Sequence, residues 1–105
     1  MNITIDQWQE QLKEDSEAII IDVRTQEEMD EGCFEKAILL DIKDPPKFME
    51  DAQKLDPSQT YYVYCKSSDR STQACMVLGS LGFKNLYKLE GGYEGYKEGL
   101  KTGNA

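Results

Sequence analysis

The chain has 105 residues, no histidine and a formal net charge of −8, from 20 acidic and 12 basic residues. This length allows one domain with one core, which we expect to span residues 1–105. The acidic excess argues against a nucleic-acid surface or an anionic membrane, and the lack of histidine excludes histidine-based metal sites and Cys–His pairs.

Short runs rich in β-branched or aromatic residues predict strands, and helical patterns fall between them. In chain order we expect a weak edge strand at 3–5, a helix around 8–12, a strand at 18–23, a short acidic helix at 27–31 and a strand at 37–40. A helix at 45–54, a strand at 61–64, a helix at 69–81, a strand at 85–89 and a closing helix at 93–100 follow, and 101–105 should fray. The alternation implies a three-layer α/β/α domain around a central, mostly parallel five-stranded sheet.

The sequence contains no recognisable targeting signal, membrane span or zinc pattern. The first residues are neither basic nor continuously apolar, so we expect no signal peptide, and no apolar run approaches the roughly 18 residues of a membrane span. The three cysteines, Cys33, Cys65 and Cys75, match no zinc pattern. A reduced, cytoplasmic protein with free thiols and neither metal nor organic cofactor is the simplest interpretation.

Cys65 ends the strand expected at 61–64 and precedes the helix expected from Asp69. In an open parallel sheet, ligands bind outside the carboxyl ends of the strands. A tight turn of N–H groups and a helix N-terminus can hold an anion there, and Lys66 and Arg70 add positive charge. Free cysteine is usually just a small buried apolar residue, but this setting stabilises a thiolate without histidine and favours a nucleophile.

Residues 65–71 resemble the active-site loop of the rhodanese-like sulfurtransferases, Cys-x-x-x-x-Arg-Ser/Thr between a strand and a helix. Three further segments follow the family's order. Residues 21–28 are similar to its Asp-Val-Arg segment, 31–37 to its Gly-His-Ile-Pro-Gly-Ala segment, and 81–96 to its closing motif. The resemblance covers almost the whole chain.

Four positions depart from the family pattern. Cys33 replaces the usual His, Glu35 the Pro and Lys36 the Gly, and Ser68 stands where many members carry Gly. The first three precede a strand and bear on folding more than on catalysis. Ser68 bears on the stiffness of the loop and on which of its N–H groups point inward.

The resemblance implies that sulfane sulfur moves by ping-pong chemistry. A donor such as thiosulfate leaves one sulfur on Cys65 as a persulfide, and cyanide, a small thiol or a protein thiol removes it. In this scheme Cys65 is the nucleophile, and Arg70 fixes the loop shape and its local potential. Lys66 either attracts anionic donors or is an ordinary solvated lysine. The anion cradle is the backbone of Lys66, Ser67, Ser68, Asp69, Arg70 and Ser71.

Side chains at neighbouring strand ends have two interpretations each. Asp22 and Arg24 either brace the loop or form a structural ion pair, with a contact between Arg24 and Glu28 as another option. Gly91-Gly92 either lines the mouth of the site or makes a plain turn. Asp69 is expected as the cap of the following helix, and Tyr93 and Tyr96 as core or rim.

The thiols of Cys33 and Cys75 are expected to take no part in sulfur transfer, because neither is placed to resolve a Cys65 persulfide. The helix at 27–31 must carry the chain back across the sheet, so we expect Cys33 to enter the next strand at its amino end, which is the edge opposite the loop. Cys75 lies about six residues into the helix after the loop, roughly 9 Å along its axis.

Two rival functions stay open. One is a binding module that keeps the fold and presents the loop to a partner. The other is a cysteine phosphatase or arsenate reductase on the same scaffold. Four residues separate Cys65 from Arg70, one fewer than in the related phosphatases. A loop this small should not hold three equatorial phosphoryl oxygens.

Overall fold

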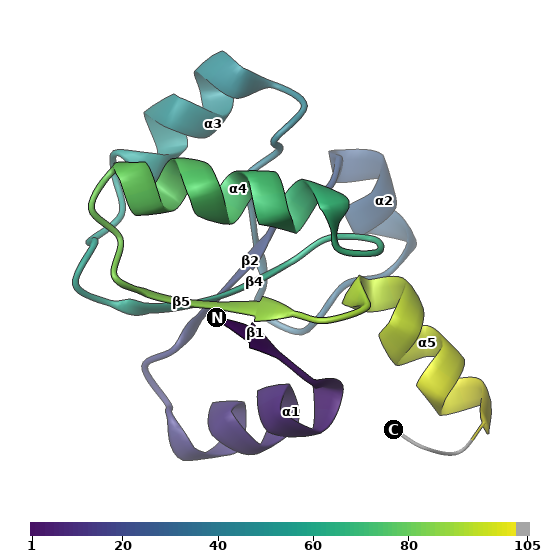
Figure 1. Ribbon diagram of the computed structural model, residues 1–105. Helices are drawn as coiled ribbons and strands as arrows, with labels where there is room; N and C mark the ends of the chain where they lie inside the picture. The colour runs from purple at the N-terminus through teal and green to yellow at the C-terminus, as the bar shows by residue number, and fades with distance from the viewer. Residues whose placement is uncertain (103–105) are drawn as a thin grey trace.

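The computed structural model describes the backbone of residues 1–102 and the side chains of residues 1–98. Strands and helices alternate along the chain (Figure 1). The elements are β1 (Asn2–Ile3), α1 (Ile5–Glu14), β2 (Ile19–Asp22), α2 (Gln26–Glu31), β3 (Ile38–Leu39), α3 (Pro45–Ala52), β4 (Thr60–Tyr64), α4 (Asp69–Ser80), β5 (Asn85–Leu89) and α5 (Gly92–Thr102).

The five strands form one sheet in the order β1-β5-β4-β2-β3, and every neighbouring pair is parallel. Asp22 pairs with Tyr64 and with Leu39, so the carboxyl ends of β2, β3 and β4 lie side by side. This edge therefore gathers the residues that follow each strand, as expected for an open parallel sheet. The expected fold class is confirmed.

Side chains of β4 alternate between two apolar layers, because successive strand residues point to opposite faces. Tyr61, Val63 and Cys65 join the layer covered by α3 and α4. Tyr62 and Tyr64 join the aromatic layer covered by α1, with Trp8 at its centre. Figure 1 shows α3 and α4 on one side of the sheet and α1 on the other.

The first strand is shorter than the expected 3–5. Thr4 caps α1 in a reciprocal pair with Gln7: the Gln7 N–H donates to Thr4 Oγ1 at 3.2 Å, and Thr4 N–H donates to Gln7 Oε1 at 2.9 Å. The capping box draws Ile5 into the helix, which leaves only two residues to pair with β5.

At the other end of the chain, α5 runs two residues beyond the expected end at 100. Fraying was expected over 101–105, yet residues 101 and 102 are helical, and 103–105 lie outside the described residues. Within the described part of the chain, no helix is long and apolar enough to cross a membrane.

Lys36, which stands where the family pattern has Gly, has a φ of +66°. This is the left-handed region, which a glycine adopts at no steric cost and a lysine does not. Lys36 therefore holds, at some cost in strain, a backbone conformation that a glycine would adopt freely.

Candidate functional site

Cys65 lies directly after β4 and beneath the first turn of α4. Its side chain is buried, and its Sγ accepts a hydrogen bond from the Ser71 N–H at 3.3 Å. The thiol in turn donates to Ser71 Oγ at 3.4 Å, and that hydroxyl donates to the Ser68 carbonyl at 3.0 Å. The sulfur therefore sits where the partial positive charge of a helix N-terminus favours an anion.

The loop from Lys66 to Arg70 has open backbone donors. Within the described residues, no acceptor takes a hydrogen bond from these five N–H groups, whereas the loop carbonyls are partly used. Tyr93 N–H donates to the Cys65 carbonyl at 2.8 Å, and Glu94 N–H donates to the Lys66 carbonyl at 2.9 Å. The N-terminal turn of α5 thus satisfies the acceptors of the loop and leaves its donors available for an anion.

Gly92 makes this docking of α5 possible. Its φ is +63°, and a Cβ atom added there would lie 2.6 Å from the Lys66 carbonyl oxygen and 2.7 Å from that of Cys65. Gly91, with φ +79°, is exposed and completes the turn. Among the described residues, neither glycine lines the pocket beside the loop. The two glycines form the turn into α5, and Gly92 in addition packs against the backbone carbonyls of the loop.

Arg70 is held by an acid from another element. Its guanidinium donates two hydrogen bonds to the Glu28 carboxylate of α2, at 2.6 and 2.8 Å. The Arg70 hydrogen bonds lower the pKa of Glu28 from 4.5 to about 2. This bidentate pair ties the start of α4 to α2 and excludes the suggested contact between Arg24 and Glu28.

Arg24 pairs with Asp22 instead, in a network that is almost fully buried. Arg24 Nε donates to Asp22 Oδ1 at 3.0 Å, and Nη2 donates to Oδ2 at 2.7 Å and to the Gly32 carbonyl at 2.7 Å. Burial disfavours the guanidinium charge, but Asp22 outweighs it and raises the pKa of Arg24, which stays charged.

Two tyrosines complete the network. Tyr64 Oη donates to Asp22 Oδ2 at 2.8 Å, and burial raises the pKa of Tyr64, so its hydroxyl remains a donor. The Arg24 guanidinium carbon lies 5.3 Å from the Tyr64 ring centroid and 4.8 Å from that of Tyr93. The ion pair therefore connects β2, β4, α5 and the chain after α2.

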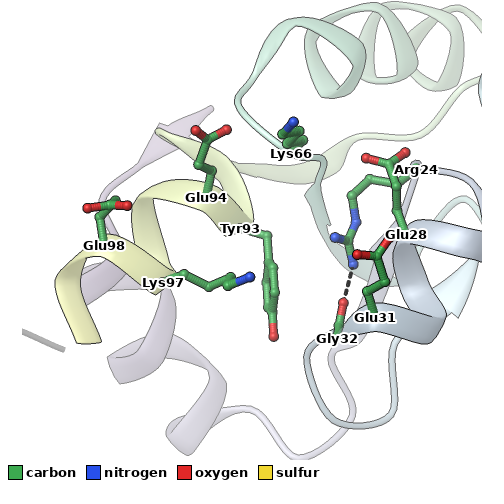
Figure 2. A pocket seen from close by; sticks show the side chains of 9 residues that line it. All are labelled: Arg24, Glu28, Glu31, Gly32, Lys66, Tyr93, Glu94, Lys97 and Glu98. Atoms are coloured by element: carbon green, nitrogen blue, oxygen red, sulfur yellow. Dashed lines mark hydrogen bonds between the residues drawn. The ribbon is translucent and has the colours of Figure 1, made fainter. Parts of the chain in front are cut away.

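A pocket of about 340 Å³ opens beside Lys66, the residue after Cys65. Figure 2 shows its two walls, one from α5 and one from α2 and the segment that follows it. The side chains and backbone that line it are Arg24, Glu28, Glu31, Gly32, Lys66, Tyr93, Glu94, Lys97 and Glu98. Tyr93, expected in the core or rim, lies in the wall of this pocket.

Ser68 and Asp69 lie differently from expectation. Ser68, not Asp69, is the N-cap residue of α4, although its side chain makes no capping hydrogen bond. Its φ of −172° lies outside the left-handed region that favours glycine. Asp69 is the first helical residue and is exposed.

The expected place of Cys33 is wrong. The six-residue helix α2 does not carry the chain back across the sheet; the segment 33–37 does. Gly32 lines the pocket, and a Cβ on it would lie 3.2 Å from Tyr93 Oη, so the exposed Cys33 that follows is on the side of the loop. Cys75 is half-buried in α4, and burial raises the pKa of its thiol.

Within the described residues, no group of three or more Cys, Asp or Glu side chains is arranged to hold a metal ion. Glu28, Glu31 and Lys97 also line the site, although no sequence pattern predicted this. The Ser/Thr-x-x-Glu pattern of Thr25 and Glu28 marks a helix start, but no local signal shows that this carboxylate also reaches Arg70.

The acid dependence of stability should report on the ion pair between Glu28 and Arg70. Because the pKa of Glu28 is lowered on folding, its contribution is fully present above about pH 4.5 and is lost as the pH falls through about 2. We expect Glu28→Gln to lower the free energy of unfolding by about 1–2 kcal/mol at pH 7, since the side chain is partly exposed. The difference from the wild type should shrink toward pH 2.

Urea unfolding followed by circular dichroism across this pH range measures the effect. Glutamine keeps the reciprocal cap with Thr25, so the variant isolates the ion pair. Glu27→Gln, at an exposed neighbouring position of α2, is the charge-matched control. Equal losses for the two variants, or a difference independent of pH, would show that the ion pair adds no stability.

Comparison with known proteins places this arrangement in a family. Residues 5–99 match the family model described as rhodanese-like domain. A tRNA uridine(34) hydroxylase of Chlamydia caviae is 36% identical over 107 residues, covering 97% of this chain and 32% of the relative. For that of Chlamydia pneumoniae the identity is 36%, over 97% of this chain and 33% of the relative. The chain therefore spans about one third of the length of these curated relatives.

Solved structures show the same architecture. A rhodanese-related protein from Thermoplasma volcanium superposes with a TM-score of 0.79 at 27% identity, over 92% of this chain and 90% of the other. A human single-domain sulfurtransferase has a TM-score of 0.74 at 20% identity, over 92% and 95% of the two chains, and is similar in fold. By its sequence match and its structure, this chain belongs to the rhodanese-like domain family.

Proposed function

We propose that the domain is a sulfurtransferase that moves sulfane sulfur through a persulfide on Cys65. The observation that supports this most is the loop itself: a buried sulfur lies against the N-terminus of α4, next to five backbone N–H groups without acceptors among the described residues. Open donors in this loop can hold the negative charge of a terminal sulfur, on the same principle as an oxyanion hole.

The reaction has two displacements at sulfur. The Cys65 thiolate attacks the outer sulfur of thiosulfate, the S–S bond of the donor breaks, and sulfite leaves with the bonding electron pair. Cyanide or a thiolate then attacks the outer sulfur of the persulfide and leaves as thiocyanate or a new persulfide, while the Cys65 thiolate returns. Covalent catalysis thus divides one transfer into two easier steps.

The remaining residues would position this chemistry. The backbone of residues 66–71 forms the cradle, and the Glu28 carboxylate fixes Arg70 at the start of α4. Asp22 and Arg24 hold the wall formed by Gly32 and Tyr93. Lys66, exposed at the pocket, supplies the local positive charge for an anionic donor.

The name of the curated relatives raises tRNA as a second candidate partner. We propose a small-molecule reaction for this domain because its net charge of −8 opposes contact with a phosphate backbone. A gel-shift titration with bulk tRNA at low salt should show no complex, and a complex there would favour a role on RNA.

The decisive experiment is intact-mass analysis after incubation with thiosulfate, followed by addition of cyanide or a dithiol. We expect the mass of one sulfur atom to be added and then removed, with thiocyanate formed when cyanide is the acceptor. Hydrolysis of an aryl phosphate, measured in parallel, should be negligible because the short loop cannot surround a phosphoryl group.

Two outcomes would overturn the proposal. An unchanged mass together with no turnover would favour the binding module. Rapid hydrolysis of the aryl phosphate, abolished by Cys65→Ser, would favour the phosphatase.

A further inference from the structure

We propose that the pocket beside the loop selects a zwitterionic low-molecular-weight thiol as the sulfur acceptor, with Lys97 binding its carboxylate and Glu31 its ammonium group. The inference rests on the proposed transfer reaction and concerns the specificity of the same site. It assigns roles to two residues on opposite walls of the pocket (Figure 2).

The size and position of the pocket fit a small acceptor. Its volume of about 340 Å³ lies at the lower end of the range for small-molecule sites, roughly 300–1,000 Å³. Lys66 is part of the lining and follows Cys65 directly, so a molecule in the pocket lies next to the residue that would carry the persulfide. The Tyr93 ring supplies an apolar wall for the carbon atoms of such a ligand.

Some charges of the lining already have partners inside the protein. Arg24 is paired with Asp22, and Glu28 with Arg70. Four lining side chains make no hydrogen bond or ion pair with any described residue: those of Lys97, Glu31, Lys66 and Glu94. The pocket therefore offers charges of both signs to a ligand.

The two walls set the pattern of charge. Figure 2 shows Lys97 reaching from α5 toward the Tyr93 ring, with Glu31 on the opposite side, on α2. Glu31 and Glu94 would repel an acceptor that carries only negative charges. A neutral thiol would form no charge interaction with either wall. A thiol that carries both an ammonium and a carboxylate group can be complementary to both.

The test measures how fast different thiols discharge the Cys65 persulfide. The protein is first loaded with thiosulfate and freed of excess donor, and the loss of the added sulfur is then followed by intact mass. Cysteine, N-acetylcysteine and cysteine methyl ester carry, respectively, both charged groups, the carboxylate only and the ammonium only. Dividing each variant's rate by the wild-type rate for the same thiol cancels the intrinsic reactivity of that thiol.

Lys97→Gln should lower the rate at which cysteine and N-acetylcysteine discharge the persulfide by about three- to tenfold. The rate with cysteine methyl ester should not change, since only the first two thiols carry a carboxylate. Glu31→Gln should lower the rates with cysteine and its methyl ester to a similar extent, since both carry an ammonium group. The rate with N-acetylcysteine should not change. Lys84→Gln and Glu17→Gln make the same changes in net charge at exposed positions outside this pocket, and should leave all three rates as they are.

The pattern separates this inference from the proposed function. If Lys97→Gln and Glu31→Gln changed all three rates equally, or changed none, the assignment of the acceptor would be wrong while sulfur transfer stood. If thiosulfate never loaded Cys65, the transfer reaction itself would be wrong, and the assignment with it.

Discussion

Replacing Gly92 with alanine is expected to lower the free energy of unfolding by roughly 2–5 kcal/mol and to remove most sulfur transfer. The new Cβ would lie within 2.7 Å of the Lys66 and Cys65 carbonyl oxygens, and against that of Ser67. All three are backbone atoms, so no side chain can rotate away. The left-handed φ of +63° adds strain for any residue with a Cβ.

The same displacement should disturb the site. If α5 moved away from the loop, the Tyr93 and Glu94 N–H groups would no longer satisfy the Cys65 and Lys66 carbonyls, and the cradle would lose its fixed shape. Thermal unfolding measures the loss of stability, and an assay of sulfur transfer from thiosulfate to cyanide on the same preparation measures the loss of activity.

Gly95→Ala is the matched control. Gly95 lies in the same helix, and a Cβ added there would meet nothing within 4 Å apart from the adjoining backbone of that helix. Because alanine favours a helix over glycine by about 0.5–1 kcal/mol, this variant should be equally or more stable, with normal transfer. A Gly92→Ala protein as stable and active as the Gly95→Ala protein would show that the close contact between α5 and the loop is unimportant.

Cys65→Ser should abolish transfer and leave the added sulfur undetectable by mass, while the protein remains folded. Serine is close in shape to cysteine and keeps a polar atom near the Ser71 N–H, but an alkoxide does not form a stable sulfur adduct at neutral pH. Unfolding curves of the variant establish that the loss is chemical.

Cys33→Ser and Cys75→Ser separate a one-thiol from a two-thiol mechanism. Burial raises the pKa of Cys75, which disfavours its thiolate, and we expect its replacement to leave transfer unchanged. Cys33 is exposed and follows a residue that lines the pocket, so its replacement is the sharper test. Turnover should persist in Cys33→Ser; its loss without loss of stability would mean that Cys33 takes part in sulfur transfer.

The sequence alone determined the elements of this protein, because their signals are local. Alternation between apolar strand runs and helical periodicity gave the parallel sheet, and β5 lies at 85–89 as expected. The position of Cys65 between a strand and a helix fixed the sulfur at the carboxyl edge of the sheet. Each of these patterns depends on residues a few positions apart, which the chain order displays directly.

The tertiary structure decided which distant groups meet. Glu28 had a local alternative four residues away in Arg24, but it pairs with Arg70, which is 42 positions along the chain. Arg24 pairs with the buried Asp22, because two opposite charges that are both removed from water are stable only when they are paired. Sequence spacing does not show which of two acids lies nearer once the sheet has formed.

In the turn from β5 into α5, too, the sequence predicted the local conformation but not the contacts that it makes. The sequence marked Gly91-Gly92 as a turn, but only the fold shows Gly92 packed against the carbonyls of the loop and Tyr93 in the wall of the pocket. The length of α2 likewise placed Cys33 on the side of the loop, where the strand pattern had predicted the far edge. Close backbone approach and the path of an irregular segment depend on the packing of the whole domain, so local periodicity does not encode them.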